Sequence, residues 1–325
     1  MRRREFLTLA SAAATVAWRS GARAQEPGRV YRLGNLFSAP REAPHQVALR
    51  KQLWRASFIE GQNLWIDDDG YGLSADGFNR HADDLVKARV DVILAGGDAA
   101  VRAAQRATTE IPVLALTDDM VGQGFVHSLA RPDGNITGVT ILAAELDEKR
   151  QSILIEAVPN ARRIALLADS EISKPEHLQA LQDAAHNQGM EVSLHLVARP
   201  NEIAPAIDAA LAVGAKALNI LASALFFNNR SIIFERVAAQ RLPAIYQWPE
   251  MAAQGGFMGY GPSIVQLYRD VQSRQLLQLL RGTKPADLPV EQPTTFELVI
   301  NLKAAKALGL NVPSVLLAQA DGVIE

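Results

Sequence analysis

Residues 91–108 read DVILAGGDAAVRAAQRAT, and this stretch contains the unit from which the fold is built. Asp91–Ala95 is almost entirely apolar, which predicts a strand covered on both of its faces. Two glycines then allow a tight turn, and Ala99–Thr108 has the composition of a helix. A buried strand followed by a short turn and a helix is typical of a parallel α/β sheet.

The same unit recurs along most of the chain, so we expect an α/β fold in which parallel sheets are flanked by helices. The strands are too many for one sheet of ordinary size, and two sheets of about five strands each fit the length better. The other candidate strands are Val30–Phe37, Asn63–Asp67, Pro112–Leu116, Ile136–Ile141, Arg163–Ala168, Glu191–Val197, Ala217–Leu221, Ala244–Tyr246, Phe257–Tyr260 and Phe296–Ile300. The other candidate helices are Ala75–Ala88, Glu145–Ala157, Pro175–Gln188, Glu202–Leu211, Arg230–Gln240 and Ile264–Arg281.

Three segments rich in Gly, Asn or Pro are candidates for crossings between two lobes. They are Gly134–Val139, Gly255–Gly261 and Pro285–Pro293. Three crossings predict a hinge that includes Gly138, with the long helix after Gly261 returned to the first lobe. The sequence thus predicts a first lobe of residues 28–137 plus 259–284 and a second lobe of residues 138–258 plus 292–325.

The N-terminus has the three parts of an export signal. Arg2–Arg4 is basic, Thr8–Trp18 is apolar, and Ala22–Ala24 is a small-residue cleavage site. The arginines before Glu5-Phe6-Leu7 favour a twin-arginine signal, with an ordinary secretory signal as the alternative. We therefore expect residues 1–24 to be removed near Ala24, leaving a periplasmic protein without membrane insertion, because the apolar run is too short to span a bilayer.

Composition excludes several functional classes. The chain has no cysteine, so disulfides and thiolate metal sites are absent. The formal charge is −2, and the cleaved chain would hold 28 basic and 34 acidic residues, which argues against a nucleic-acid partner. Among the six histidines only His177 and His186 share a helix, and the run Asp67–Asp69 is more typical of a solvated loop than of a cation site. We expect no metal.

Sequence motifs for nucleotide binding and for catalysis are missing. Gly96-Gly97-Asp98 lacks the spacing of a dinucleotide loop, and the P-loop, the serine-hydrolase elbow and the zinc-protease motif are absent. Carboxylates at strand ends, including Asp118, leave an exported α/β enzyme as a remote alternative, but no nucleophile accompanies them. We expect no cofactor and no enzymatic activity.

Ligands of parallel α/β folds bind beyond the carboxyl ends of the strands, and this rule selects the candidate binding residues. Backbone N–H groups near Ser38 and Gly97 would hold an acid group, with Asp98 capping the helix, whereas Asp119 or Glu250 would pair with an amine. Apolar contact would come from Tyr246 and from one of two adjacent phenylalanines, the other being core. The full set is Ser38, Gly97, Asp98, Thr117, Asp119, Asp169, Ser223, Phe226, Phe227, Asn228, Tyr246 and Glu250.

Several longer stretches resemble a known family. They include SLARPDGNITGVT, KRQSILIEAVPNARRIALL, ALFFNNR, RLPAIYQWPEMAAQGGFMGYGPS and GTKPADLPVEQPTTFELVINLKAAKALGLNVP. The chain is similar to periplasmic substrate-binding proteins of ABC importers of the tryptophan/tyrosine type. This resemblance implies a two-lobed, type I-like periplasmic-binding-protein fold that closes on a small organic solute, such as an amino acid or an aromatic or carboxylate compound.

The resemblance also implies partners and site positions. The partner would be a membrane permease with a cytoplasmic ATPase, and the alternative is a sensor subunit that presents the same ligand to a signalling protein. Phe226-Phe227-Asn228 matches a Phe-Phe-Asn segment of the family, and Tyr260-Gly261 matches a hinge. Departures occur at Thr117-Asp118, at Asp169-Ser170-Glu171 and at Ala224-Leu225, all at expected pocket edges, so the ligand is expected to differ from those of relatives.

Overall fold

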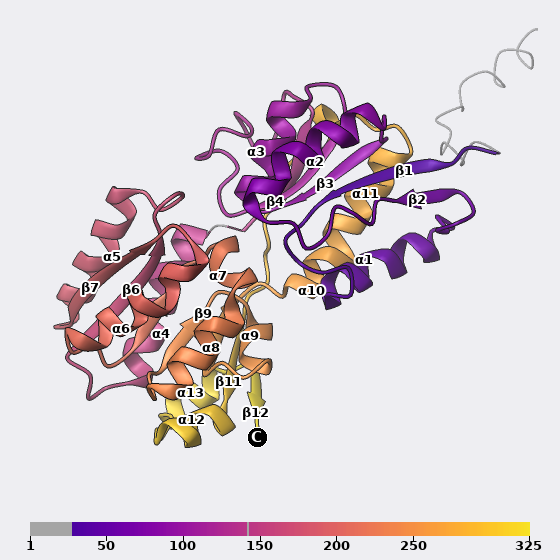
Figure 1. Cartoon of the computed structure of the whole chain (residues 1–325). Coiled ribbons are helices and arrows are strands. Elements are labelled where there is room, and N and C mark those ends of the chain that lie inside the picture. Colours follow the sequence, from indigo (N-terminus) through magenta and orange to yellow (C-terminus); the bar gives the residue numbers. More distant parts are fainter. Residues whose placement is uncertain (1–27, 142) are drawn as a thin grey trace, which may run out of the picture.

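The computed structural model describes residues 28–141 and 143–325, and the chain forms two α/β lobes (Figure 1). The expected signal peptide, residues 1–24 with its cleavage site near Ala24, lies outside the described residues. Within the described ranges, no helix is long and apolar enough to cross a membrane. The predicted fold class, two lobes built from mostly parallel sheets flanked by helices, is confirmed.

The first lobe contains a five-stranded parallel sheet in the order β2-β1-β3-β4-β5. Helices α2 and α3 pack against each other beside β1, β3 and β4, and α1 lies on the other face with α11. The elements in chain order are β1 (Tyr31–Leu36), α1 (Pro44–Arg55), β2 (Leu64–Ile66), α2 (Ala75–Lys87), β3 (Val92–Gly96), α3 (Asp98–Ala107), β4 (Val113–Thr117) and β5 (Ile136–Thr140).

The second lobe contains a seven-stranded sheet in the order β12-β11-β10-β9-β8-β6-β7. Its pairs are parallel except β10–β11, which is antiparallel. The elements are α4 (Ala143–Ala157), β6 (Arg163–Asp169), α5 (Pro175–Asn187), β7 (Glu191–Val197), a 3₁₀ turn (Pro200–Glu202), α6 (Ile203–Ala212), β8 (Leu218–Ile220), α7 (Ala224–Asn228), α8 (Arg230–Ala239), β9 (Ala244–Tyr246), α9 (Pro249–Ala253), β10 (Met258–Gly261), β11 (Glu297–Asn301), α12 (Leu302–Leu308), α13 (Ser314–Gln319) and β12 (Gly322–Ile324).

The long helix between β10 and β11 belongs to the first lobe. It comprises α10 (Ile264–Gln266), a π-helical stretch (Leu267–Gln272) and α11 (Ser273–Leu280), and it packs on α1, β3 and β5 (Figure 1). A 3₁₀ turn (Pro285–Asp287) then contacts β5. The chain therefore passes between the sheets three times: after β5, after β10 and before β11.

Strand pairing corrects the expected lobe boundaries by a few residues. Residues 138–140 were expected in the second lobe, but they complete β5 and pair with β4 in the first sheet. Residues 259–261 were expected in the first lobe, but they pair with β9 and β11 in the second sheet. Of the expected hinge residues, Gly138 consequently lies in the middle of β5, and Tyr260 and Gly261 are the last two residues of β10.

The quoted stretch forms β3 and α3, and its burial explains its continuous apolar character. Val92 and Leu94 contact the core beneath α1, whereas Ile93 and Ala95 contact the core beneath α2 and α3. All four side chains are at most 1% exposed. A strand with helices on both faces has no solvent face, so every position favours an apolar residue.

Gly138 illustrates how tightly the first sheet is packed. Its φ is +140°, and a Cβ atom built on it would lie 1.9 Å from the carbonyl oxygen of Ala115 on β4. Its own carbonyl accepts hydrogen bonds from the backbone of Glu291 and from the side chain of Gln275. This glycine therefore allows β5 to contact both its neighbouring strand and the third crossing.

We expect Gly138→Ala to lower the free energy of unfolding by about 1–3 kcal/mol or more, because alanine is strained at this φ and collides with Ala115. Gly134→Ala is the matched control, because a Cβ atom there meets no atom within 4 Å. Chemical denaturation of both variants measures the difference. Equal stability of the two would contradict the packing described here.

Candidate ligand-binding site

A small cavity lies where the carboxyl ends of strands from the two lobes meet. Its volume is about 50 Å³, room for one or two water molecules. The first lobe contributes the ends of β1, β3 and β4 together with α1 and the α10–α11 region, and the second lobe contributes α7 and the segment after β9. The lining residues are Phe37, Ser38, Ala39, His45, Gly96, Gly97, Leu116, Thr117, Asp118, Ala224, Phe227, Asn228, Gln247, Trp248, Ile264 and Tyr268.

Two other hollows help to place this cavity in the fold. A wide one of about 1070 Å³ lies near the amino ends of β1, β3 and β4, beside Tyr31, Asp91 and Pro112. Parallel α/β folds bind ligands at the opposite strand ends, so we do not assign the ligand there. A second cavity of about 280 Å³ adjoins the small one, because both are lined by His45 and Phe227.

Aromatic rings from both lobes surround the small cavity. In the first lobe the His45 ring lies 4.7 Å from that of Tyr268, and the Phe37 ring lies 6.3 Å from Tyr268. In the second lobe Phe227 and Trp248 make an edge-to-face contact at 6.0 Å. His45 and Phe227 approach to 6.1 Å across the cleft. The rings thus form a nearly continuous apolar wall to which both lobes contribute.

Polar groups are few and come mainly from strand ends. Thr117 is 1% exposed, and its hydroxyl has no hydrogen-bond partner in the described part of the chain. The Gln247 side-chain oxygen accepts a hydrogen bond from the backbone N–H of Ser223 at 2.7 Å. Ser38 and Asn228 are further uncharged polar side chains on the cavity. A solute here would meet hydrogen-bonding groups on both lobes.

Two carboxylates at this junction have no counter-ion of their own. Asp98 is 6% exposed, and neither of its oxygens has a side-chain hydrogen-bond partner or an ion pair among the described residues. Burial raises its pKa to about 6, although the backbone N–H of Asp118 partly offsets this effect. Burial also raises the pKa of Asp118 well above its usual range, and the neighbouring charge of Asp98 raises it further.

The structure places five of the expected binding residues on the cavity: Ser38, Gly97, Thr117, Phe227 and Asn228. Two expected aromatic residues lie elsewhere. Phe226 is 1% exposed and packs in the core, because adjacent residues of α7 point in different directions. Tyr246 is fully buried against Phe234 in the second lobe, because the last residue of β9 points into the core.

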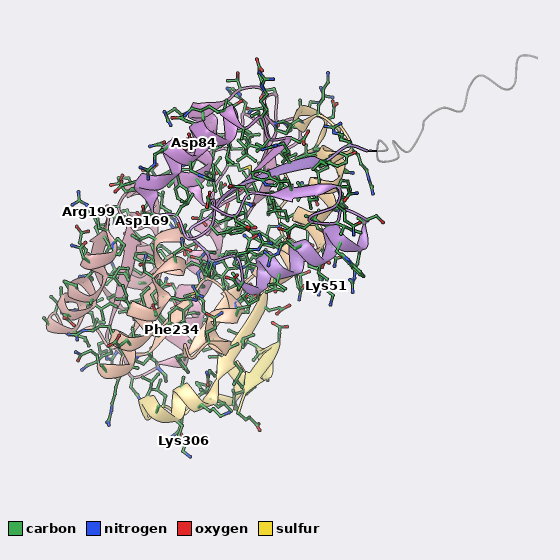
Figure 2. The ribbon with its side chains drawn as sticks, turned by 45° about the vertical axis from the view of Figure 1, so that its right-hand side comes forward. Lys51, Asp84, Asp169, Arg199, Phe234 and Lys306 are labelled. Atoms are coloured by element: carbon green, nitrogen blue, oxygen red, sulfur yellow. The ribbon has the colours of Figure 1, made fainter. Side chains whose placement is uncertain are left out.

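Two further expected residues lie behind the cavity wall. The Ser223 hydroxyl caps α7 by accepting from the backbone N–H of Leu225, and it donates to Asp169 at 2.6 Å. Asp169 also accepts from the backbone N–H of Glu171, so its carboxylate is bound within the second lobe. Figure 2 shows Asp169 where the second lobe meets the first. Asp98, described above, likewise adjoins the cavity without lining it.

Asp119 and Glu250 have structural partners instead of a place on the cavity. Asp119 accepts from the backbone N–H of Gly122, and it forms an ion pair at 3.4 Å with Lys174 of the opposite lobe. Glu250 accepts from the Ser263 hydroxyl at 2.6 Å, next to the second crossing, and lines the adjoining cavity. Both side chains therefore link the lobes, a role that their positions in sequence do not reveal.

Sequence reasoning missed four rings of the wall: Phe37, His45, Trp248 and Tyr268. His45 and Tyr268 come from helices that pack beside the strand ends, so a rule based on strand ends does not select them. Trp248 follows β9 by two residues and takes the position expected for Tyr246. Trp248 lies beyond the last residue of β9, so the alternation of side chains within the strand does not determine its direction.

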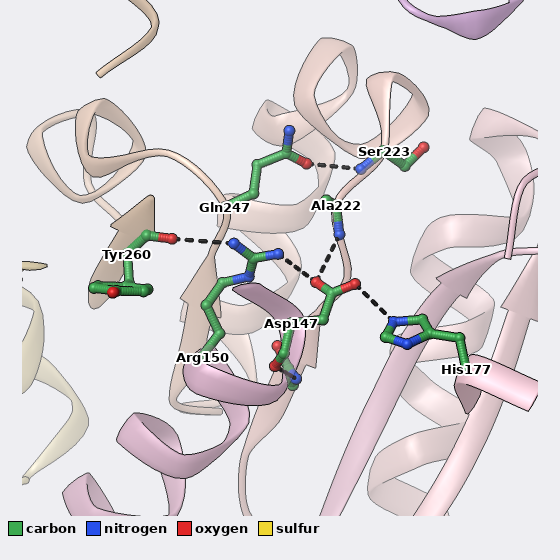
Figure 3. A network of polar contacts seen from close by, with 8 residues as sticks. Asp147, Arg150, His177, Ala222, Ser223, Gln247 and Tyr260 are labelled. Atoms are coloured by element: carbon green, nitrogen blue, oxygen red, sulfur yellow. Dashed lines mark hydrogen bonds and ion pairs between the residues drawn. The ribbon is translucent and has the colours of Figure 1, made fainter. Parts of the chain in front are cut away.

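A buried polar network fixes the second-lobe side of the site (Figure 3). Asp147 of α4 forms an ion pair with Arg150, accepts from the backbone N–H of Ala222 at 3.1 Å and contacts His177 at 3.1 Å. Arg150 donates to the carbonyl oxygen of Tyr260 at 3.1 Å. The network thus joins the strand end before α7 to the end of β10, where the chain leaves the lobe.

Removal of one member of the buried Asp147–Arg150 ion pair should strongly lower the free energy of unfolding. The Asp147 and Arg150 side chains are 5% and 1% exposed, so Asp147→Ala leaves a buried guanidinium without its carboxylate. We expect a loss of about 3–5 kcal/mol in the free energy of unfolding. Asp208→Ala, which breaks the partly exposed Arg236–Asp208 pair, is the control and should cost less than about 1 kcal/mol. Thermal and chemical denaturation compare the two, and similar losses would refute the role assigned to Asp147.

Known proteins share this architecture. A solved domain from Streptococcus pneumonia in complex with L-Trp has a TM-score of 0.79 at 22% identity, covering 91% of this chain and 100% of that one. A ligand-free, open substrate-binding protein with adhesive properties from Clostridium difficile has a TM-score of 0.63 at 22% identity, covering 91% and 99%.

Sequence comparison agrees with the structural comparison. A tyrosine-binding protein from Clostridioides difficile (strain R20291) is 24% identical over 264 residues, which are 80% of this chain and 75% of that protein. The family model for ABC transporter substrate binding proteins matches residues 74–324, which is well over half of the chain. The chain therefore belongs to the family of ABC transporter substrate-binding proteins, as the sequence motifs indicated.

Proposed function

We propose that this protein is an exported receptor that encloses a small organic solute between its lobes and delivers it to an ABC importer. The observation that carries this proposal is the shared wall of the cavity: Phe37, His45 and Tyr268 come from one lobe, and Phe227 and Trp248 from the other. A solute placed there contacts both lobes at once, so its binding favours their closure. Membership of a substrate-binding family supports the same function.

The size of the cavity indicates how the solute enters. A space of about 50 Å³ is far below the roughly 300–1,000 Å³ of ordinary ligand pockets. An amino acid or an aromatic compound therefore requires the lobes to separate or the rings to move. The three crossings provide the hinge for this motion, and the Asp119–Lys174 ion pair, which is about half exposed, is weak enough to break.

The relatives and the export signal suggest the setting. One relative is named for tyrosine, and a structural neighbour holds L-Trp, so an amino acid with an aromatic side chain is a reasonable first ligand. The partner would be a membrane permease powered by a cytoplasmic ATPase. Cleavage near Ala24 would release the chain into the periplasm, and the site residues would act in binding without catalysis.

The adjacent phenylalanines allow a matched test. Phe227→Ala removes a cavity wall, so we expect roughly tenfold weaker solute binding, because an aromatic contact contributes on the order of 1 kcal/mol beyond area burial. Phe226→Ala empties a core position, so we expect a loss of about 3–5 kcal/mol in stability and a smaller effect on affinity.

The measurement is a thermal-shift screen of amino acids, aromatic acids and aromatic amines, followed by calorimetric titration of each hit. If no solute raises the melting temperature of the native protein, the proposed function fails. If hits bind Phe227→Ala as tightly as the native chain, the cavity is not the site.

A further inference from the structure

We propose that the preferred solute is an organic cation: a protonated amine on an apolar or aromatic group, without a free carboxylate. This inference rests on the receptor function proposed above and names its substrate class. It starts from Asp118, which lines the cavity and has no hydrogen bond or ion pair from its carboxylate in the described part of the chain. Asp98 lies beside it, 6% exposed and likewise without a side-chain partner or an ion pair among the described residues.

The surrounding charges do not neutralise this pair. The main charges acting on Asp98 and Asp118, besides each other, are the carboxylates of Asp119, Asp147 and Asp169 and the cations Arg102 and Arg150. Asp119 is paired in turn with Lys174, and Asp147 contacts both Arg150 and His177. Two of these cations already pair with Asp147 and Asp119. The site therefore keeps an excess of negative charge when the lobes are together.

Arg102 only partly compensates the negative charge of Asp98 and Asp118. It lies on α3, donates to the side-chain oxygen of Gln123 at 3.0 Å and stacks on the ring of Phe125 at 5.1 Å. The charge of Arg102 lowers the pKa of Asp98 and so opposes the effect of burial, but Arg102 forms no ion pair with Asp98. A cation brought by the solute would be the direct partner that the two carboxylates lack.

The cavity offers nothing comparable to a carboxylate. No lysine or arginine is among its described lining residues. His45 is 4% exposed, and burial, followed by the charge of Arg230, lowers its pKa to about 4, so it is neutral at physiological pH. The backbone at Gly97, where an acid group was expected, is followed directly by Asp98, whose charge would repel that group. A zwitterion would gain binding free energy from its amine and lose binding free energy through its carboxylate.

The remaining lining suits a cation as well. Ring faces of tryptophan, tyrosine and phenylalanine attract ammonium groups. Phe37 and Tyr268 from one lobe and Phe227 and Trp248 from the other are present around the cavity. The buried Thr117 hydroxyl is an unused acceptor and donor on the same wall. Carboxylates beside an aromatic enclosure are the combination that recognises amines.

Arg230 is the residue whose position would favour a solute with a carboxylate. It lines the adjoining cavity, donates to the carbonyl oxygen of Phe227 and to the side chain of Gln254, and stacks on the Phe227 ring at 4.9 Å. A solute long enough to enter both cavities could place a carboxylate there. The experiment is therefore designed to separate these two outcomes.

The test is a matched series on the native protein. Tyramine, tyrosine and 3-(4-hydroxyphenyl)propanoate share one ring and carry the amine alone, both groups, or the carboxylate alone; choline is a compact cation. By calorimetric titration we expect tyramine or choline to bind at least about tenfold more tightly than tyrosine, and the propanoate not to bind. Tighter binding of tyrosine than of either cation, weakened by Arg230→Ala, overturns the inference while the receptor function stands.

Asp118→Asn is the decisive variant, because it removes the charge and keeps the shape. We expect it to weaken binding of the preferred cation by roughly 10- to 100-fold, with less effect on tyrosine. Asp84→Asn is the control, since Asp84 pairs with Lys87 on the outer surface of the first lobe (Figure 2) and should change neither affinity. An unchanged ratio of cation to zwitterion affinity in Asp118→Asn refutes the assignment.

The pH dependence provides an independent readout. The pKa of Asp98 is raised to about 6 and that of Asp118 is also raised well above its usual range, so protons compete with a bound cation. We expect cation affinity to fall as the pH is lowered from 7.5 to 5, with proton release on binding, whereas the amine itself stays charged. His45 does not titrate in this range. Affinity that does not change over this range would contradict the inference.

Discussion

The carboxyl ends of strands from two parallel sheets meet at one place, and the rest of the site depends on this geometry. β1, β3 and β4 end on one side of the cavity, and β8 and β9 end on the other. Residues that are far apart in the sequence, such as Ser38 and Gln247, become neighbours only because the chain crosses between the lobes three times. The fold therefore creates the site by juxtaposition, and neither lobe contains it alone.

The same geometry brings charge together at an energetic cost. Asp98 and Asp118 belong to the first lobe, whereas Asp147 and Asp169 belong to the second, and the second-lobe charges add to the effect of burial in raising the pKa of the first-lobe pair. Asp147 and Asp169 have their own hydrogen-bond partners, so the uncompensated charge is concentrated on the first-lobe pair. Closure without a partner for that pair is disfavoured, and a bound cation would remove the penalty. The ligand's charge and the closing motion are then linked in one equilibrium.

Much of this arrangement could be predicted from the sequence. The parts that could not be predicted depend on side-chain direction after a strand and on tertiary packing. Apolar strands followed by turns and helices, as at Asp91–Thr108, identified the sheets and the strand ends that bear ligands. Tyr246 ends β9 with its side chain in the core, whereas Trp248 lies in the turn after the strand, where strand alternation no longer determines which side chain faces the cavity. His45 and Tyr268 reach the site by tertiary packing of helices, which no local pattern encodes.

The second-lobe wall shows why such a site can be selective despite its small number of polar groups. Ala222 and Ser223 precede α7, and both are held in place: one donates its backbone N–H to Asp147, the other to Gln247. Phe227 and Asn228 follow within the same short helix, so the position of that helix sets where both side chains lie. A wall that is already ordered loses little conformational entropy on binding. Selectivity can then come from the charge and shape of the solute, since the protein does not rearrange this wall to suit each candidate.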